Sequence, residues 1–154
     1  EALLETDPLE GKTAVVVDDG GHWEGMGVAE HFINRGASVH FVTRYPMFAP
    51  QVAATAARED AMARMNREGR FRLHLESRVE GVEKGMARIA PAYGGSHLDV
   101  PADRLAFVSI NHANRDLVEE LRGLGPNVQV VGDASAPRYL ETAIREGHMA
   151  GRFI

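Results

Sequence analysis

The chain of 154 residues is long enough for one domain with a hydrophobic core, and its 44% hydrophobic and 25% charged residues are typical of a globular protein. Its 17 basic and 22 acidic side chains give a formal net charge of -5, which argues against a surface for nucleic acid or anionic membranes. The absence of cysteine excludes disulfides, thiolate nucleophiles and Cys-ligated iron–sulfur clusters within this chain.

The first twelve residues, Glu1 to Lys12, form a predicted polar linker. No apolar run approaches the roughly 20 residues that span a bilayer, and no charged-then-apolar leader opens the chain. We therefore expect a cytoplasmic protein without a membrane-spanning segment. Because the chain starts at Glu1 rather than Met and opens on this linker, we expect it to be a piece of a longer protein.

The next thirty residues have the pattern of a strand–helix–strand unit. Thr13 to Val17 is a short β-branched run typical of a buried strand, and the Gly-rich segment Asp18 to Gly27 follows it as a predicted loop. A helix then ends at Gly36, and Ser38 to Thr43 is a second predicted strand. The predicted helix has three apolar residues spaced as on one helix face: Ala29, Phe32 and Ile33. Such a βαβ unit predicts a parallel sheet.

The remaining elements alternate between helices and short strands. Ala53 to Glu68 has strong helix formers and ends at Gly69, and Phe71 to Val100 predicts several short strands that form an antiparallel ribbon. The later predicted elements are a strand at Leu105–Ile110, a helix around Leu117–Leu121 capped by Asn114, a strand at Val128–Val131 and a final helix around Leu140–Ile144.

These elements predict an α/β fold: a Rossmann-like parallel sheet of the FAD/NAD(P)-binding type, with flanking helices and a small antiparallel β-ribbon, in one compact unit. Ligands of such sheets bind at the carboxyl ends of the strands. Three predicted loops leave such ends: Asp18–Gly27, Ser109–Asn114 and Gly132–Arg138.

The first loop occupies the place of a dinucleotide-binding fingerprint without matching it. The fingerprint needs glycine directly after the strand so that the backbone can approach a diphosphate. Here Asp18 and Asp19 come first, and Gly20 and Gly21 follow. Because two carboxylates repel a diphosphate, we interpret the loop as structural, a decayed nucleotide site, with a working site at Gly20 and Gly21 as the alternative.

Arg44 directly follows the second predicted strand. An arginine at this place suits the 2′-phosphate of NADP, whereas an acidic residue suits the ribose of NAD. The alternative interpretation is an exposed arginine with no ligand.

The third loop is the most specific segment of the chain. In Gly132-Asp133-Ala134-Ser135-Ala136-Pro137-Arg138, the glycine allows a tight turn, Asp133 can accept hydrogen bonds from sugar or ribitol hydroxyls, and Pro137 suits the first turn of the following helix. Cofactor contacts are expected from Gly132, Asp133, Ala134 and Arg138. The alternative is that Asp133 or Ser135 only caps this helix.

The chain has no motif for a catalytic group or a metal ion, and His22 beside Asp18 and Asp19 is a minor alternative as part of a metal or acid–base cluster. The seven histidines show no metal-ligand spacing, and no serine lies in a nucleophile elbow. We therefore predict no catalytic residue and no metal site in this chain.

The Gly132–Arg138 segment and the following Ala143-Ile144-Arg145-Glu146-Gly147-His148 resemble the closing strand and helix of a flavoprotein dinucleotide domain. They are most similar to the C-terminal region of the NADH:flavin oxidoreductases related to trimethylamine dehydrogenase and 2,4-dienoyl-CoA reductase. The Asp18–Glu30 segment resembles the amine-dehydrogenase branch, in which the glycine fingerprint has degenerated, and Leu105–Leu121 parallels the strand and helix before the closing motif. The resemblance therefore covers nearly the whole chain in order.

The resemblance implies a parent enzyme with an N-terminal TIM barrel that carries FMN and a 4Fe-4S cluster, followed by an FAD-like domain with an NAD-like insert. It implies that residues 13–126 are the NAD(P)-binding-like insert and that 127–154 are the closing strand and helix of the FAD-like domain. ADP or FAD would bind a partial site at Asp133, and NAD(P)H is a less favoured cofactor. The partners would be the missing barrel and FAD-like portions, in a parent expected to be a homo-oligomer.

Two departures from the family pattern favour a branch that passes its electrons to a protein acceptor. Asp18 and Asp19 replace fingerprint glycines, and Ile110 stands where related reductases have glycine. We therefore expect a nucleotide-binding or vestigial scaffold domain of a flavin-dependent oxidoreductase, not catalytic alone. The alternatives are a working NAD(P)H-binding domain and, more remotely, a receiver-like phospho-acceptor module that would use Asp18 and Asp19 to hold Mg²⁺.

Overall fold

The computed structural model describes residues 2–4, 6–122 and 128–153. The chain divides into two compact units, 1–109 and 110–154. The sequence predicts one compact unit with a boundary between 126 and 127, and that boundary lies outside the described residues. In the second unit, the Arg115 guanidinium donates to the carbonyl groups of Ala134 (3.3 Å) and Ser135 (2.7 Å).

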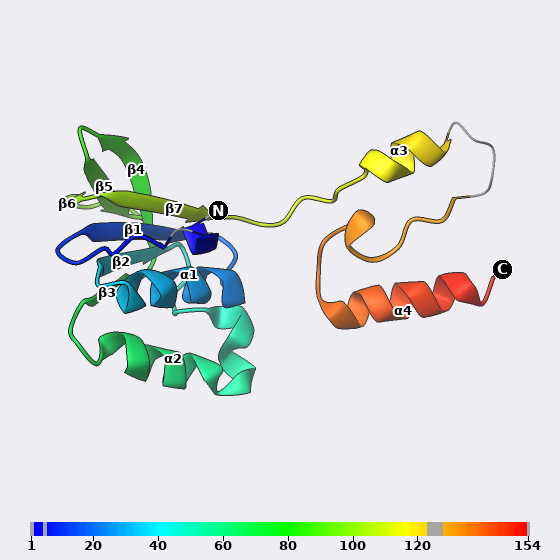
Figure 1. Ribbon diagram of the computed structural model, residues 1–154, viewed down its shortest axis with the longest axis horizontal. Helices are drawn as coiled ribbons and strands as arrows, with labels where there is room; N and C mark the ends of the chain where they lie inside the picture. Colours follow the sequence, from blue (N-terminus) through cyan, green and yellow to red (C-terminus); the bar gives the residue numbers. More distant parts are fainter. Residues whose placement is uncertain (1, 5, 123–127, 154) are drawn as a thin grey trace. The chain divides into compact units, whose positions relative to one another are not determined.

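The first unit is built on a four-stranded parallel sheet in the order β3-β2-β1-β7 (Figure 1). Its strands are β1 (Thr13–Asp18), β2 (Ser38–Thr43), β3 (Phe71–His74) and β7 (Arg104–Val108). In the centre of the sheet, Val16 of β1 lies opposite Phe41 of β2 and Ala106 of β7. The predicted parallel sheet is confirmed, and β2 has the predicted bounds.

Helices cover one face of this sheet: α1 (Trp23–Asn34) and α2 (Ala57–Asn66), with the 3₁₀ helix η2 (Pro50–Thr55) before α2 (Figure 1). A further 3₁₀ turn, η1, spans Ala2–Leu4. The core on this face includes Phe41, Phe48 and Phe71, whose ring centroids lie 4.9–6.1 Å apart. Such aromatic packing contributes stabilisation beyond the buried area alone.

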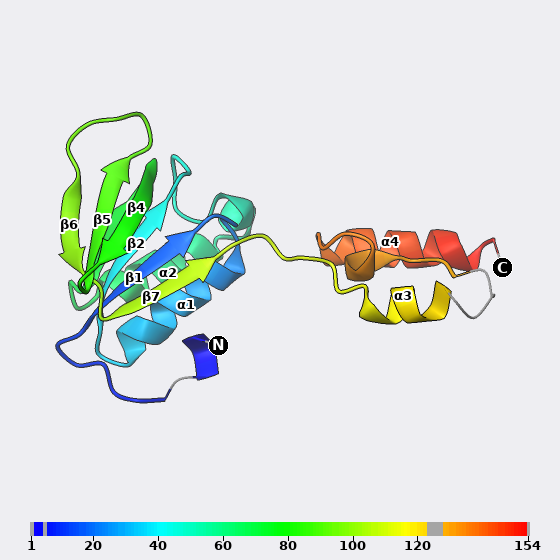
Figure 2. The same cartoon turned by 90° about the horizontal axis from the view of Figure 1, so that it is seen from above.

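A three-stranded antiparallel sheet covers the opposite face (Figures 1 and 2). It consists of β4 (Ser77–Glu83), β5 (Met86–Pro91) and β6 (Leu98–Pro101). The second core cluster lies between the two sheets and contains Val15, Val17, Val42, Ala87, Ile89 and Val100. Because both faces of β1 are covered, its apolar run is continuous rather than alternating.

Three predictions for this unit need correction. Phe71–His74 joins the parallel sheet rather than the ribbon, because it pairs with β2 and buries Phe71 in the aromatic core. The helix predicted from Ala53 begins only at Ala57, since Ala56 has a φ of +56° and separates η2 from α2. The predicted linker contains Leu9, which is buried in the core and whose amide donates to the Arg35 carbonyl (2.8 Å).

The second unit contains α3 (Asp116–Arg122), the 3₁₀ turn η3 (Gly132–Ala134) and α4 (Leu140–Gly151). Asn114 lies one residue before the N-cap position of α3, which Arg115 occupies, but its side-chain oxygen accepts a hydrogen bond from the amide of the first helical residue, Asp116 (3.1 Å). The strand predicted at 128–131 is wrong, because a strand requires a hydrogen-bonded neighbour and the described part of this unit contains none. Pro137 lies before α4 rather than in its first turn.

None of the helices in the described residues is both long and apolar enough to cross a membrane.

Candidate functional site

The loop after β1 directs its backbone amides to oxygen atoms of the chain itself. The Asp19 amide donates to the carbonyl of Val108 in β7 (2.9 Å). The Gly20 amide donates to Oδ1 of Asp18 (3.2 Å), and the Gly21 amide donates to both carboxylate oxygens of Asp18 (3.0 and 3.1 Å). Three consecutive amides at the carboxyl end of the sheet are therefore already partnered.

The Asp18 side chain is 1% exposed, although it carries a carboxylate. Burial raises the pKa of this carboxyl group above its ordinary value, and the hydrogen bonds from Gly21 and Gly20 offset part of that rise. Thr43, at the end of β2, is also 1% exposed and donates its hydroxyl to the Asp18 carbonyl (2.9 Å). The end of β1 is thus held in place by its two neighbouring strands and by its own loop.

The predicted loop is shorter than expected, since α1 begins at Trp23 and places Gly25 and Gly27 within the helix. A Cβ atom at Gly25 would lie only 2.7 Å from Cγ and Oδ1 of Asp18, whereas one at Gly27 would meet nothing within 4 Å. Gly25 therefore lets the first turn of α1 approach the Asp18 carboxyl group. This is the place where a Rossmann-like fold binds the phosphate of a dinucleotide.

Residues after β2 cover Gly21 from the other side. A Cβ atom at Gly21, which has a φ of +66°, would lie 2.8 Å from the Tyr45 ring and 3.0 Å from Pro50. The Gln51 amide also donates to the Gly21 carbonyl (2.9 Å). Tyr45 and η2 therefore pack directly against the glycine loop.

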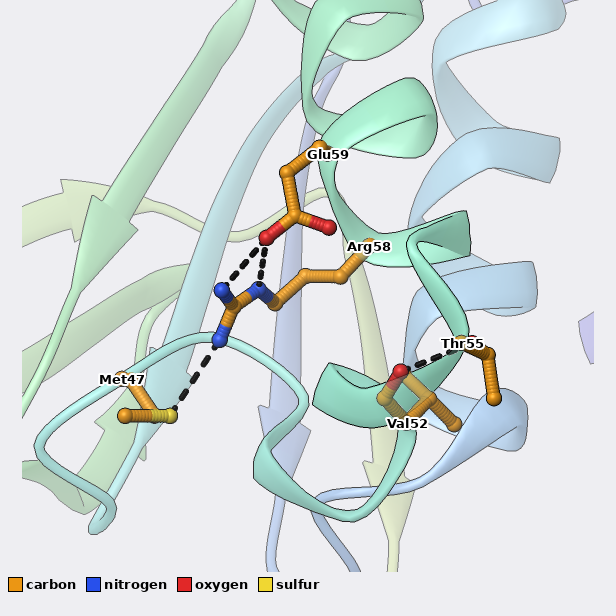
Figure 3. Close-up of polar contacts among 5 residues, drawn as sticks. All are labelled: Met47, Val52, Thr55, Arg58 and Glu59. Atoms are coloured by element: carbon orange, nitrogen blue, oxygen red, sulfur yellow. Dashed lines mark hydrogen bonds and ion pairs between the residues drawn. The ribbon is translucent and has the colours of Figure 1, made fainter.

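Side-chain contacts hold the segment that follows β2 in this position (Figure 3). Within η2, the Thr55 hydroxyl donates to the Val52 carbonyl (2.7 Å), and Val52 is buried in the core. Arg58 of α2 donates to the sulfur of Met47 (3.2 Å) and to the carboxylate of Glu59. The cover over Gly21 is thus continuous with the core and with α2.

Arg44 lies at the end of β2, beside this loop. Its guanidinium donates to the Asp19 carbonyl (3.2 Å) and lies 5.3 Å from the centre of the Tyr45 ring. The Tyr45 hydroxyl donates to the same carbonyl (3.0 Å). The structure therefore brings the predicted residues Gly20, Gly21 and Arg44 together and engages all three in contacts within the chain.

In the second unit, Gly132 and Arg138 share one acceptor. The Gly132 amide donates to Oε2 of Glu146 in α4 (2.8 Å), and the Arg138 guanidinium pairs with Oε1 of the same carboxylate. Gly132 has a φ of +63°, and a Cβ atom there would lie 3.3 Å from the Cβ of Ala143. Glycine therefore favours both the left-handed turn and the close approach of α4.

Asp133 and Ala134 border an open concavity of about 470 Å³. Its lining residues are Asn111, His112, Asn114, Asp133, Ala134 and Pro137. Asp133 is exposed and is not a helix cap, since the residue that precedes α4 is Tyr139 and η3 is preceded by Val131. Within this unit, the predicted loops after 109 and after 131 thus lie side by side, and their carboxylate, amide and imidazole groups can hydrogen-bond to hydroxyl groups.

Two residues that contact the predicted sites have no signal in the sequence. Tyr45 is an ordinary residue after a strand, and only the folded chain places its ring on Gly21. Glu146 lies 14 positions after Gly132, so no local pattern connects them. In the residues that the structure describes, no three histidine, aspartate or glutamate side chains converge in a way that could hold a metal ion.

The fold is similar to that of several flavoproteins. Histamine dehydrogenase from Rhizobium sp. 4-9 matches at a TM-score of 0.85 and 26% identity, over 98% of this chain and 24% of that protein. The 6-hydroxypseudooxynicotine amine oxidase from Pseudomonas geniculata N1 matches at 0.84 and 18% identity, over 94% of this chain and 22% of that protein. A 2-naphthoyl-CoA reductase matches at a TM-score of 0.74 and 20% identity, over 94% of this chain and 21% of that protein.

The chain thus spans about a quarter or less of the length of these proteins. No protein-family model matches it, and no curated protein sequence does. The structural matches nevertheless extend over nearly the whole chain and include both units. The chain therefore resembles, in its fold as in its sequence, the dinucleotide-binding-like region of flavoproteins of the trimethylamine dehydrogenase type.

Proposed function

We propose that this chain is a Rossmann-like domain of a flavin-dependent oxidoreductase of the amine-dehydrogenase type, which holds a nucleotide or supports the assembly and has no catalytic residue of its own. The match to histamine dehydrogenase over 98% of this chain supports this proposal. In the same proposal, the parent is a cytoplasmic homo-oligomer, its TIM barrel carries FMN and a 4Fe-4S cluster, and that barrel selects the substrate.

The observation that carries the proposal is the engagement of the loop amides after β1. A nicotinamide dinucleotide needs these amides as donors to its diphosphate. Here Gly20 and Gly21 donate to the Asp18 carboxylate, which also adds a negative charge where the diphosphate would lie. The working NAD(P)H-binding domain is therefore the less favoured alternative, even though Arg44 lies beside the loop.

The second unit offers the better place for part of an adenine nucleotide or FAD. Asp133 is exposed at the open concavity with His112 and Asn111, where sugar or ribitol hydroxyls would find acceptors. Gly132 and Arg138 would act through Glu146, which positions the turn that presents Asp133. We propose this as half of a site, completed by the FAD-like portion of the parent.

Thermal unfolding of the 154-residue chain with ADP, FAD, NADH or NADPH tests the proposal. A ligand at about 100 times its dissociation constant stabilises the folded state by roughly 2.7 kcal/mol, which shifts the melting temperature by several degrees. We expect no shift with NADH or NADPH. A shift with either cofactor, lost on changing Arg44 to alanine, would contradict the proposal and favour the reductase alternative.

A further inference from the structure

The carboxylate of Asp18 occupies a position that has the features of an anion-binding site. It receives hydrogen bonds from two successive glycine amides, Gly20 and Gly21. It also lies against the first turn of α1, a helix of 12 residues, at the place where Gly25 has no side chain. Backbone amides and a helix N-terminus both favour negative charge.

The carboxylate is also enclosed, which distinguishes it from an ordinary turn residue at the surface. Asp18 is 1% exposed, so its charge has little access to water. Tyr45 and Pro50 cover the adjoining Gly21, and the Asp19 amide is bound to β7. The space beside the amides is therefore filled by a charged group of the chain, which excludes a second anion through volume and through like-charge repulsion.

We propose that Asp18 is a specificity-determining residue that serves as an internal anion, taking the amide donors of Gly20 and Gly21 and thereby excluding phosphate groups from this loop. The inference deepens the proposed function and rests on it, because it treats the loop as one descended from a phosphate-binding loop. Once the carboxylate is removed, the loop is expected to bind a phosphate group of an inorganic or organic ligand.

Inorganic phosphate and the Asp18→Ala variant of the 154-residue chain test this inference. Alanine retains the Cβ atom and removes only the carboxylate, so the two glycine amides lose their acceptor. At ten times its dissociation constant, phosphate is expected to raise the folding equilibrium constant of this variant about elevenfold, measured by urea unfolding against sodium chloride of equal ionic strength. Phosphate also stabilises folded proteins in general because it is excluded from their surface. The stabilisation that phosphate gives the wild-type chain measures this effect and is subtracted from that of the variant.

Asp19→Asn is the matched control, because it removes the same charge from the neighbouring position and leaves the Asp18 carboxylate on its amides. The wild-type chain and Asp19→Asn are expected to gain no phosphate-specific stability. An equal gain in Asp19→Asn would overturn the inference, since the effect would then be one of net charge.

Asp18→Asn is the second variant, because a carboxamide keeps the shape of the side chain and holds the amides without a charge. It is expected to gain phosphate-specific stability at higher phosphate concentration than Asp18→Ala. If Asp18→Ala is unfolded, its refolding by phosphate but not by chloride supports the inference. Absence of a gain or of refolding in both variants overturns it.

The two proposals fail separately. Binding of NADH by the wild-type chain contradicts the proposed function, whatever the variants do. If the wild-type chain binds no NADH and the Asp18 variants gain no stability from phosphate, only the proposed role of Asp18 is contradicted.

Discussion

Replacing Gly25 with alanine tests how closely the Asp18 carboxyl group packs against α1. In an exposed helix interior, alanine is more stable than glycine by about 1 kcal/mol. At Gly25, however, the new Cβ atom would lie 2.7 Å from Cγ and Oδ1 of a side chain that is 1% exposed. Overpacking of this kind costs about 1–3 kcal/mol, so we expect Gly25→Ala to destabilise the chain by about 1 kcal/mol after the helix gain is subtracted.

Gly27→Ala is the matched control in the same helix, because its Cβ atom would meet nothing within 4 Å. We expect this variant to stabilise the chain by about 1 kcal/mol. Urea unfolding followed by the fluorescence of Trp23, the single tryptophan and a residue of α1, reports both changes. In an Asp18→Ala background, Gly25→Ala should be less harmful, with a coupling of about 1 kcal/mol. Equal stabilisation by Gly25→Ala and Gly27→Ala would refute the close packing of Gly25 against the Asp18 carboxyl group.

Two further predictions concern the histidine pair and the turn at Gly132. The imidazoles of His40 and His74 lie 2.9 Å apart (Nδ1 to Nε2), and burial lowers the pKa of both below 6.5. The folded chain then binds fewer protons than the unfolded chain, so stability is lost as pH falls through about 6.5. The urea midpoint should be lower at about pH 5.5 than at about pH 7.5, and a His40→Leu/His74→Leu variant should lose this difference; an undiminished difference would assign it to other groups. Glu146→Ala removes the acceptor of the Gly132 amide and should weaken this turn by about 1 kcal/mol. Hydrogen exchange of that amide should become several-fold faster, and an unchanged rate would contradict the contact.

Local patterns predicted the parallel sheet well because β1, α1 and β2 form one continuous βαβ unit. Ser38–Thr43 has the predicted bounds, since its apolar residues are buried on both faces of the sheet. Strand pairing is less local. Residues 128–131 have the composition of a strand but pair with no strand among the described residues of their unit, and Phe71–His74 pairs with β2 instead of joining the ribbon.

The candidate site was predictable in composition but not in geometry. Asp18 and Asp19 indicate from sequence alone that a diphosphate would be repelled. The return of the Asp18 carboxylate to the amides of Gly20 and Gly21 depends on the turn at Gly21, whose φ of +66° no residue pattern specifies. Contacts that join distant positions, such as Glu146 with Gly132, likewise require the folded chain.

The glycine loop after β1 is occupied by the chain itself, and we infer that it does not bind a nicotinamide dinucleotide. Amide nuclear magnetic resonance of the ¹⁵N-labelled chain, titrated with NADH to millimolar concentration, tests it at the residues concerned. We expect the amide signals of Gly20 and Gly21 to keep their positions throughout. Saturable shifts of these two signals, with a common dissociation constant, would contradict it.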